Sequence, residues 1–330
     1  MTLENLLAFH LICILQIDFF NLNYLYMNLF QRSVRLVKEF RNLPNRINKI
    51  QEALGRIENR QVNKQINNNF EFRVFSQWGE DGIIQYLINN VLITNKTFVE
   101  FGVENYLESN TRFLLLNNNW SGLVLDGSDT NINFIKEDLD ISYAHDLRSE
   151  SIFITAENIN EILTRNEILD DIGLLSIDVD GNDYWIWNAI TVIRPRIVVC
   201  EYNSLFGPTS RISTPYSPKF YRGDAHYSNV YYGASISALI YLANKKGYSL
   251  VAGNSAGNNV FFVRNDVIGN IKVISATEAY VKTKFKEAKD KKGKLTYQDF
   301  ESMLNEIKSL EIVEVEKNLH STISEILNLK

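Results

Sequence analysis

Residues 172–181 read IGLLSIDVDG, and this stretch sets the expectation for the fold. An apolar run climbs to Ile177 and then breaks into Asp178, Asp180 and Gly181. A continuous apolar run is typical of a parallel strand that helices cover on both faces. Carboxylates crowded this closely repel one another. The strand end therefore needs a positive partner.

Similar runs lie on either side of this stretch and alternate with helical segments. The expected strands are residues 97–103, 121–127, 141–146, 172–181 and 196–203, with helices near 110–118, 157–166 and 184–190. This alternation predicts an α/β fold with a doubly wound, mostly parallel sheet. Residues 247–264 read as two strands joined by a glycine-rich turn, which predicts an antiparallel hairpin that closes the sheet.

The composition of the 330-residue chain is that of a globular protein, with 45% hydrophobic and 22% charged residues. A net charge of −5 argues against nucleic acid as a partner, because nucleic-acid binding usually needs a basic face. Cys13 and Cys200 are the two cysteines, which provide neither a disulfide framework nor a zinc-binding spacing. The cytoplasm is the expected compartment.

Four segments are expected along the chain. Residues 1–28 are apolar but too interrupted to form a membrane span, and two interpretations remain: translation starts at Met27, or the segment is an interfacial anchor. Residues 29–70 form a helical arm, residues 71–268 a catalytic domain and residues 269–330 a peripheral helical tail. Within the catalytic domain, residues 204–232 form a long aromatic insert, expected to be an ordered lid over the substrate.

The arm carries a short heptad seam of Ile47, Ile50, Leu54 and Ile57. Nine basic and three acidic residues lie between positions 31 and 65, which leaves this part with a net charge of +6. Two functional interpretations are open: a homo-oligomerising helix, or peripheral contact with an anionic membrane surface. The plain structural alternative is a solvated helix that packs on its own domain.

An acidic residue stands at the end of every expected parallel strand. These residues are Glu100, Asp126, Asp146, Asp178 and Glu201. In open α/β sheets, ligands bind outside the carboxyl ends of the strands. The alternative is that the acids cap the helices that follow, but Glu is a poor capping residue.

The first loop, EFGVENYLESNTR at 100–112, limits the kind of ligand. It lacks the three glycines of the dinucleotide fingerprint and the glycine–lysine pattern of a phosphate loop. Glu100 and Glu104 would repel a pyrophosphate. A cationic ligand without phosphate is expected, and S-adenosylmethionine meets that description with its sulfonium and ammonium groups.

The motifs FVEFGVE (98–104), GLVLDG (122–127), LLSIDVDGNDY (174–184) and VVCEYN (198–203) resemble class I S-adenosylmethionine-dependent methyltransferases. More narrowly, they are similar to the FkbM-like group, many of whose members modify sugars, polyketides and surface polysaccharides. The resemblance covers about residues 75–265. The first motif departs from the family pattern, because residues 105–107 (Asn-Tyr-Leu) stand where glycine is common.

The resemblance implies O-methylation of a saccharide or a related polar metabolite. Glu100 and Gly102 would border the amino-acid end of the cofactor, Asp126 would bind the ribose and Asp146 the adenine. Asp178 would bind the ammonium group or a metal ion. Thr111 and Gly127, in the same loops, are further candidate cofactor-binding residues.

Two interpretations compete for the acids of the fourth and fifth strands. In one, Asp178, Asp180, Glu201 and Asn203 bind Mg²⁺ through oxygen ligands and orient the acceptor. In the other, Asp178 contacts the cofactor, Asp180 caps the next helix, and Asn182 and Asp183 form hydrogen bonds within the turn.

His226 and Asp224 in the insert are the candidate catalytic bases, and His145 is another, because histidine titrates near neutrality. The alternative for His226 is an ordinary surface residue. Two further function classes remain open. Asp178-Val-Asp180 could serve a metal-dependent glycosyltransferase, or a methyltransferase fold without catalysis could serve assembly through the arm.

Overall fold

The computed structural model describes residues 31–40, 43, 46–61, 70–137, 141 and 144–329. The chain divides into two compact units, residues 1–53 and residues 54–330. Residues 31–40 and 46–61 of the arm are helical. The apolar segment 1–28, and with it the status of Met27, lies outside the described residues. None of the helices described is long and apolar enough to cross a membrane.

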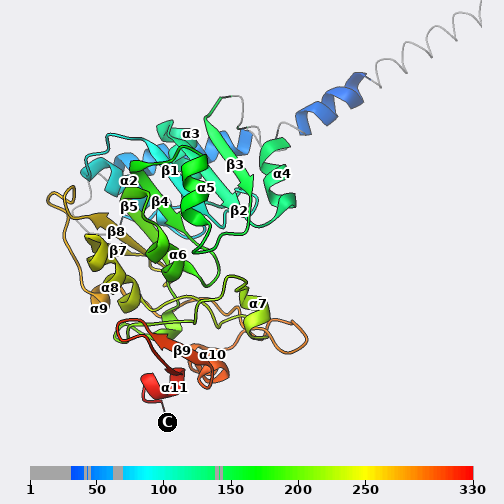
Figure 1. Ribbon diagram of the computed structural model, residues 1–330. Helices are drawn as coiled ribbons and strands as arrows, with labels where there is room; N and C mark the ends of the chain where they lie inside the picture. Colours follow the sequence, from blue (N-terminus) through cyan, green and yellow to red (C-terminus); the bar gives the residue numbers. More distant parts are fainter. Residues whose placement is uncertain are drawn as a thin grey trace, which may run out of the picture. The chain divides into compact units, whose positions relative to one another are not determined.

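The larger unit is built on a seven-stranded sheet with the strand order β3-β2-β1-β4-β5-β8-β7 (Figure 1). Its strands are β1 (Thr97–Phe101), β2 (Ser121–Asp126), β3 (Leu147–Ser151), β4 (Asp170–Ile177), β5 (Ile193–Glu201), β7 (Tyr248–Gly253) and β8 (Asn259–Arg264). The first five strands in this order are parallel, and β8 pairs antiparallel with both β5 and β7. The doubly wound sheet and its closing antiparallel hairpin are therefore confirmed.

The third strand was wrongly placed by the sequence. The strand is LRSES at Leu147–Ser151, and residues 141–146 precede it. β3 is an edge strand that pairs only with β2, and none of its five residues is fully buried. Such a strand carries no apolar run. The sequence pattern therefore favours the nearby apolar segment ISYA at 141–144 instead.

Helices cover both faces of the sheet because each strand alternates its side chains between the two faces. The helices α2 (Glu80–Asn90), α3 (Arg112–Asn118) and α4 (Asp129–Glu137) pack on one face, around Phe98, Val124 and Leu174. The helices α5 (Ile159–Arg165), α6 (Asp183–Ala189) and α8 (Ile236–Lys246) pack on the other. Both apolar layers lie beneath the carboxyl edge and hold the strand ends in fixed positions.

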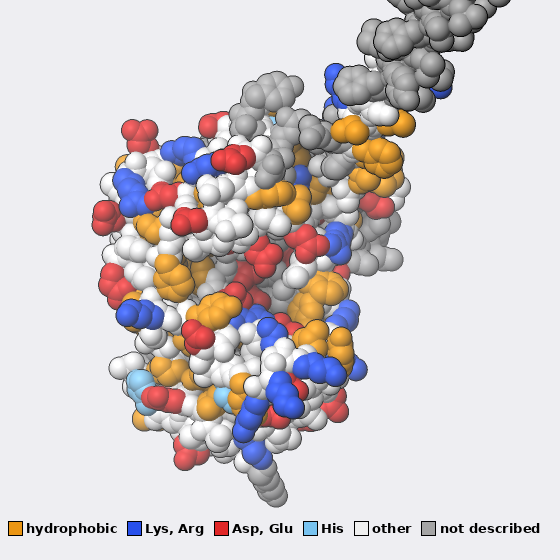
Figure 2. Space-filling view, turned by 90° about the vertical axis from the view of Figure 1, so that its right-hand side faces the viewer, with side chains coloured by type: hydrophobic (Ala, Val, Ile, Leu, Met, Phe, Trp, Pro, Cys, Tyr) orange, Lys and Arg blue, Asp and Glu red, His pale blue; other side chains and the backbone are white. Residues whose placement is uncertain are grey.

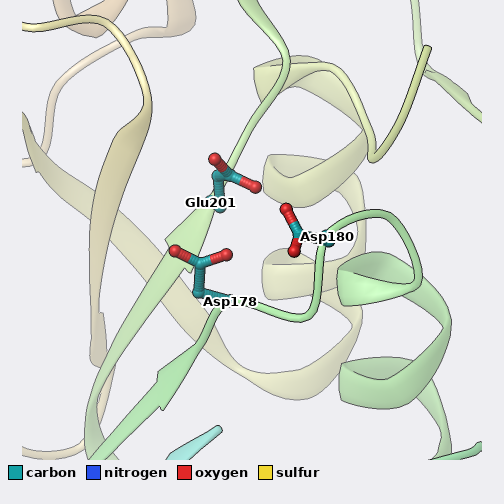
Figure 3. Close-up of side chains that lie close together, drawn as sticks. All are labelled: Asp178, Asp180 and Glu201. Carbon is teal, nitrogen blue, oxygen red and sulfur yellow. The ribbon is translucent and has the colours of Figure 1, made fainter. Parts of the chain in front are cut away.

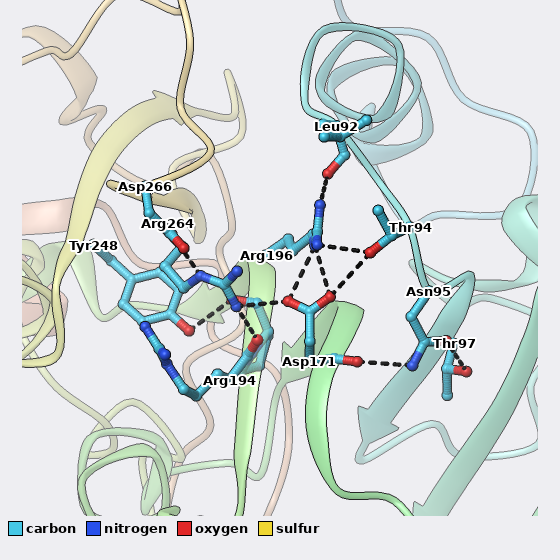
Figure 4. A network of polar contacts seen from close by, with 11 residues as sticks. Leu92, Thr94, Asn95, Thr97, Asp171, Arg194, Arg196, Tyr248, Arg264 and Asp266 are labelled. Carbon is cyan, nitrogen blue, oxygen red and sulfur yellow. Dashed lines mark hydrogen bonds and ion pairs between the residues drawn. The ribbon is translucent and has the colours of Figure 1, made fainter.

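A polar network fixes the opposite, amino-terminal edge of the sheet (Figure 4). Asp171 of β4 accepts hydrogen bonds from Arg196 Nε at 2.8 Å and from Arg264 Nη1 at 2.8 Å. Arg196 also donates to Thr94 Oγ1 at 2.7 Å. Burial raises the pKa of Asp171, but the two guanidinium groups outweigh it and hold that pKa below its usual value. The network joins β4, β5, β8 and the loop before β1.

The tail is not only helical, which corrects the sequence expectation. Besides α9 (Ala276–Ala279), α10 (Phe300–Ile307) and α11 (Ile323–Ile326), it contains β9 (Glu311–Glu314) and β10 (Leu319–Thr322). These strands form a second, antiparallel sheet with β6 (Ile212–Ser213) of the insert, in the order β10-β9-β6. A third apolar cluster joins the insert to the tail through residues such as Phe206, Tyr231, Met303 and Ile312.

Candidate functional site

A cavity of about 780 Å³ opens at the carboxyl edge of the parallel strands. The ends of β1, β2, β4 and β5 form its floor, and the insert and the tail form the opposite wall. In Figure 2 acidic side chains gather in the central hollow, and basic side chains lie just below it. The cavity therefore combines the strand ends that the sequence singled out with residues from two distant segments.

Glu100 of β1 is buried and fully engaged by the loop that follows it. Its carboxylate accepts from the Ser109 and Thr111 hydroxyls, each at 2.5 Å, and from the Asn110 and Thr111 backbone N–H groups at 2.8 and 3.1 Å. Burial raises the pKa of Glu100, and these hydrogen bonds oppose the rise. Glu100 lines the cavity, but its bonds serve to shape the loop.

The loop reaches its conformation with one glycine and two other residues that have positive φ. Gly102 has φ +70°, and a Cβ there would lie 1.7 Å from the Asp178 carbonyl oxygen, so only glycine fits between β1 and β4. Glu104 and Tyr106 also adopt positive φ values, 47° and 62°. The fully buried Tyr106 ring, whose hydroxyl lies 3.0 Å from Thr111 Oγ1, stabilises this conformation.

Thr111, expected to bind the cofactor, is completely buried and does not line the cavity. Its hydroxyl donates to Glu100 and contacts Tyr106. Its role is therefore to hold the loop rather than to touch a ligand.

Asp126 ends β2 and lies at the cavity wall together with Gly127. Its Oδ2 accepts from the Glu104 backbone N–H at 2.8 Å, and its Oδ1 from the Ser128 N–H at 2.8 Å and the Asn131 amide at 3.1 Å. A carboxylate has about four acceptor positions, so one remains for a ligand hydroxyl. The geometry suits contact with one ribose hydroxyl.

Asp146 and His145 lie away from the cavity. They precede β3, and the Asp146 carbonyl oxygen accepts from Gly122 N–H, at the start of β2, at 3.0 Å. Both residues therefore lie toward the amino-terminal edge of the sheet, opposite the site. This corrects the adenine-binding assignment of Asp146. Residues 152–154, which follow β3, line the cavity instead.

Asp178, Asp180 and Glu201 converge in the cavity (Figure 3). Each offers a carboxylate oxygen, and the three oxygens lie within 4.8 Å of one another. Burial, and then the neighbouring charges of Asp180 and Asp183, raise the pKa of Asp178 well above its usual value. Burial and Asp178 do the same to the pKa of Glu201. The cluster has the composition and spacing of a site for a hard divalent cation.

One carboxylate oxygen of Glu201 is buried and accepts no hydrogen bond from the described residues. The side chain is 7% exposed, and this oxygen is Oε2. A buried acceptor without a partner is costly in free energy. A bound cation would remove that cost.

Arg222 of α7 (Arg222–Ala225) places a positive charge next to the acidic cluster. Its guanidinium bonds to Asp180 Oδ1 at 3.0 Å and to Glu287 Oε2 at 2.5 Å, and it lies 4.6 Å from the Tyr232 ring centre. These contacts correct the interpretation of Asp180 as a helix cap. Asp183 holds the turn as predicted, accepting from the Val179 N–H at 2.9 Å, whereas the Asn182 amide donates to the Ser217 carbonyl of the insert at 2.8 Å.

Asn203, the fourth predicted metal ligand, is engaged elsewhere. Its Oδ1 accepts from Leu205 N–H at 3.0 Å, as the cap of the short 3₁₀ helix Ser204–Phe206. Its Nδ2 donates to the Val230 and Tyr232 carbonyls, each at 3.0 Å. The side chain does not line the cavity, so Asn203 fixes the insert and does not belong to the metal cluster.

His226 and Asp224, the predicted bases, also lie outside the cavity lining. Asp224 is exposed, and His226 Nδ1 lies 2.7 Å from Ser228 Oγ. Partial burial lowers the pKa of His226. The aromatic insert does contribute to the cavity, but through Arg222 of α7 and not through these two residues.

Several lining residues escaped the sequence interpretation. Gln77 precedes α2, Asn258 precedes β8, and Phe285, Glu287 and Lys289 come from the tail. The tail contains no sequence motif from which its three lining residues could have been predicted. Gln77 belongs to SQWGED at 76–81, a polar run before an apolar helix, which could have drawn notice.

No protein-family model and no curated protein matches the chain. Among solved structures, it is similar to the N-terminal domain of EvdMO1 with SAH bound (11% identity, TM-score 0.38, 63% of this chain and 95% of that one). It is also similar to an O-methyltransferase from Bacillus cereus in complex with SAH (13%, 0.37, 65% and 90%). A third is an S-adenosylmethionine-dependent methyltransferase from Clostridium acetobutylicum (8%, 0.37, 64% and 98%).

The fold rests on the chain's own architecture: the sheet order, the closing antiparallel hairpin and the two helical layers are those of a doubly wound, mostly parallel α/β sheet. At these identities and TM-scores the likeness carries no information on activity or substrate. Those depend on the residues of the site.

Proposed function

We propose that the chain is an S-adenosylmethionine-dependent methyltransferase that methylates a hydroxyl group of a saccharide or a related polar metabolite, as the FkbM-like motifs imply. The observation that carries the proposal is the acidic cavity edge. Asp126, Asp178 and Glu201 stand at the carboxyl ends of β2, β4 and β5, and all three line one cavity. The first loop provides no glycine-rich phosphate cradle, and its one basic side chain, Arg112, is buried and donates to the Tyr106 and Leu107 carbonyl oxygens. Such a rim favours a cationic nucleoside without phosphate.

The volume supports a cofactor together with an acceptor. A cavity of about 780 Å³ lies at the upper end of the usual range for small-molecule sites. Asp126 keeps one acceptor position for a ribose hydroxyl. Tyr221 and Tyr232 line the opposite wall, where an aromatic ring can stack against a sugar.

The reaction is an in-line displacement at carbon. A lone pair of the acceptor oxygen forms a bond to the methyl carbon, and the carbon–sulfur bond breaks with its electron pair moving to sulfur. The sulfonium becomes a neutral thioether, and the acceptor proton passes to a base in the cavity. The protein contributes alignment of the two reactants, which accounts for much of the rate enhancement in such reactions.

Asp178, Asp180 and Glu201 would hold a divalent cation such as Mg²⁺. The buried Glu201 oxygen without a partner and the three converging carboxylates fit this donor chemistry. A cation bound there would lower the pKa of a coordinated acceptor hydroxyl. Arg222 contributes one fixed positive charge, which leaves part of the acidic charge uncompensated.

Calorimetry with S-adenosylhomocysteine tests the proposed function. We expect the full chain to bind it, and Asp126→Asn to weaken binding about tenfold because a ribose contact to a charged acceptor is lost. The matched control is Asp129→Asn, an exposed acid of α4 outside the cavity, which should bind normally. Absence of binding to the wild-type chain, or stabilisation by a UDP-sugar instead, would contradict the proposal.

Removal of the metal is tested by thermal unfolding with and without EDTA. At Mg²⁺ concentrations about ten times its Kd, binding should add about 1.4 kcal/mol to the free energy of unfolding. Glu201→Gln should raise the metal-free melting temperature by relieving repulsion, and should abolish the Mg²⁺ shift. Asp224→Asn, in the same insert but outside the cavity, is the control. If Mg²⁺ raises the melting temperature of Glu201→Gln as much as that of wild type, the cluster does not bind the metal.

A further inference from the structure

The loop before α2 is held by a buried carboxylate. Asp81 Oδ2 accepts from the backbone N–H groups of Val74, Phe75 and Ser76 at 2.7, 2.8 and 2.8 Å, and from the Ser76 hydroxyl at 2.9 Å. The next residues of the loop are therefore presented in a fixed backbone conformation. Gln77 follows directly, is exposed and lines the cavity.

A second carboxylate ties this loop to the β7–β8 turn. Glu80 Oε2 accepts from the N–H groups of Trp78 and Gly79 at 2.9 and 2.8 Å. Its Oε1 accepts from the side-chain amides of Asn254 and Asn259 at 2.7 and 3.0 Å. The loop and the turn consequently form one rigid wall of the cavity.

The same network sets the orientation of the Asn258 amide. Asn254 Oδ1 accepts from three backbone N–H groups, those of residues 257, 258 and 259, so its Nδ2 must be the donor. That Nδ2 donates to Asn258 Oδ1 at 2.7 Å. The oxygen of Asn258 is thereby occupied, and its NH₂ group is the end left for the cavity that Asn258 lines.

We propose that Gln77 and Asn258 bind the carboxylate of the cofactor's amino-acid part. The proposal rests on the proposed function and names a subsite within it. The amino-acid end of S-adenosylmethionine carries both an ammonium and a carboxylate. The acidic strand ends attract the first and repel the second, so the carboxylate needs donors without negative charge. The NH₂ groups of two amides meet that need.

The position of the loop agrees with the length of the cofactor. The loop runs from the β1–α3 connection, where the Phe75 carbonyl accepts from Ser109 N–H at 3.0 Å, to the β7–β8 turn. In the sheet order, β4 and β5 lie between these two attachment points. Strands lie about 4.8 Å apart, so β4 is roughly 10 Å from β2 and Asp126. An extended aminobutyrate arm spans that distance from the ribose.

Lys289 is the competing candidate among the described lining residues. Arg222 is engaged by Asp180 and Glu287, whereas Lys289 forms no ion pair with any residue that the structure describes. Lys289 belongs to the opposite wall, because its backbone N–H donates to Ser228 of the insert at 3.0 Å. Its variant Lys289→Ala therefore tests whether a cation of the opposite wall binds the carboxylate instead.

The test compares two ligands by calorimetry on the full chain. S-adenosylhomocysteine carries the amino-acid part, and 5′-methylthioadenosine lacks it but keeps the adenine and ribose. Gln77→Ala should weaken binding of the first about tenfold and of the second less than about twofold. Gln77→Glu should weaken the first further by charge repulsion. Asn258→Ala should repeat the pattern, and Lys289→Ala should show no selective loss for the first ligand. Lys286→Ala, an exposed tail residue outside the cavity lining, is the control and should leave both affinities unchanged.

Three results would overturn the subsite alone: equal losses for both ligands, no loss in Gln77→Ala, or a selective loss in Lys289→Ala. Gln77 is exposed, so its replacement leaves the fold intact, and an unchanged melting temperature checks this. Failure of the wild-type chain to bind either ligand would overturn the proposed function and the subsite with it.

Discussion

Glu100 and Asp126 are acids at neighbouring strand ends, yet their surroundings give them different roles. Glu100 accepts four hydrogen bonds from residues 109–111, three at Oε2 and one at Oε1, so most of its acceptor capacity serves the loop. Asp126 accepts three and keeps one position at the cavity. The residue type alone could not distinguish them, because the difference lies in the donors that the fold brings to each carboxylate.

His226 provides a prediction at this scale. His226→Ala should leave methyl transfer and S-adenosylhomocysteine affinity within about twofold of wild type, because the imidazole is outside the cavity lining and bonds to Ser228. The measurement is kcat and KM once an acceptor is identified, and calorimetry before then. The comparison variant is Arg222→Met, which removes a cavity cation and should alter acceptor kinetics. A hundredfold loss of kcat in His226→Ala would restore histidine as the base.

At the scale of elements, the seam of the helical arm stays a prediction, and the end of this helix belongs to the larger unit, where Asn59 Nδ2 donates to Gln85 Oε1 at 2.9 Å. Ile47, Ile50, Leu54 and Ile57 are 54%, 60%, 57% and 50% exposed, although each is aliphatic. The 3-4-3 spacing places them on one stripe of the helix, which is the pattern by which helices pair in coiled coils. Homo-oligomerisation through this seam remains our expectation.

Ile50→Asp tests this seam. A charge in the middle of the stripe should shift the full chain towards monomer, weakening association by at least about tenfold because buried apolar area is lost and a charge is desolvated. Light scattering after size-exclusion chromatography measures the mass. Gln51→Asp, an exposed neighbour off the seam, is the control. A wild-type chain that is monomeric throughout the concentration range would rule the seam out as an oligomer interface.

At the scale of the whole molecule, the cavity is completed by segments far apart in sequence. The tail supplies Phe285, Glu287 and Lys289, and β9 pairs with β6 to hold the insert in place. Glu287 bonds to Arg222, which in turn bonds to Asp180. The tail is therefore part of the site and not a peripheral appendage.

Ile312→Ala tests this coupling. Ile312 of β9 is completely buried in the cluster that joins tail and insert, so its truncation should cost roughly 2–5 kcal/mol of local stability. Limited proteolysis should then cleave within residues 204–232 faster than in wild type, while the seven-stranded sheet stays resistant. Leu319→Ala in β10, where the side chain is 52% exposed, is the control. An insert as resistant as in wild type would contradict the coupling.

Much of the fold followed from local pattern. The apolar runs that end in Asp126, Asp178 and Glu201 predicted three parallel strands and the edge on which a ligand binds. The third strand was missed because β3 is a polar edge strand, and Asp146 was misplaced with it. Asn203 looked like a metal ligand, but its amide is used by the backbone of the insert.

The sequence by itself determined the doubly wound sheet and the row of acids along its carboxyl edge, because hydrophobic periodicity and strand ends are local properties of the chain. Only the tertiary structure decided which acids share one cavity, that Arg222 lies among them and His226 does not, and that the tail forms a wall. Those facts depend on side-chain direction and on contacts between segments 100 or more residues apart, such as β6 with β9. No local pattern encodes such contacts.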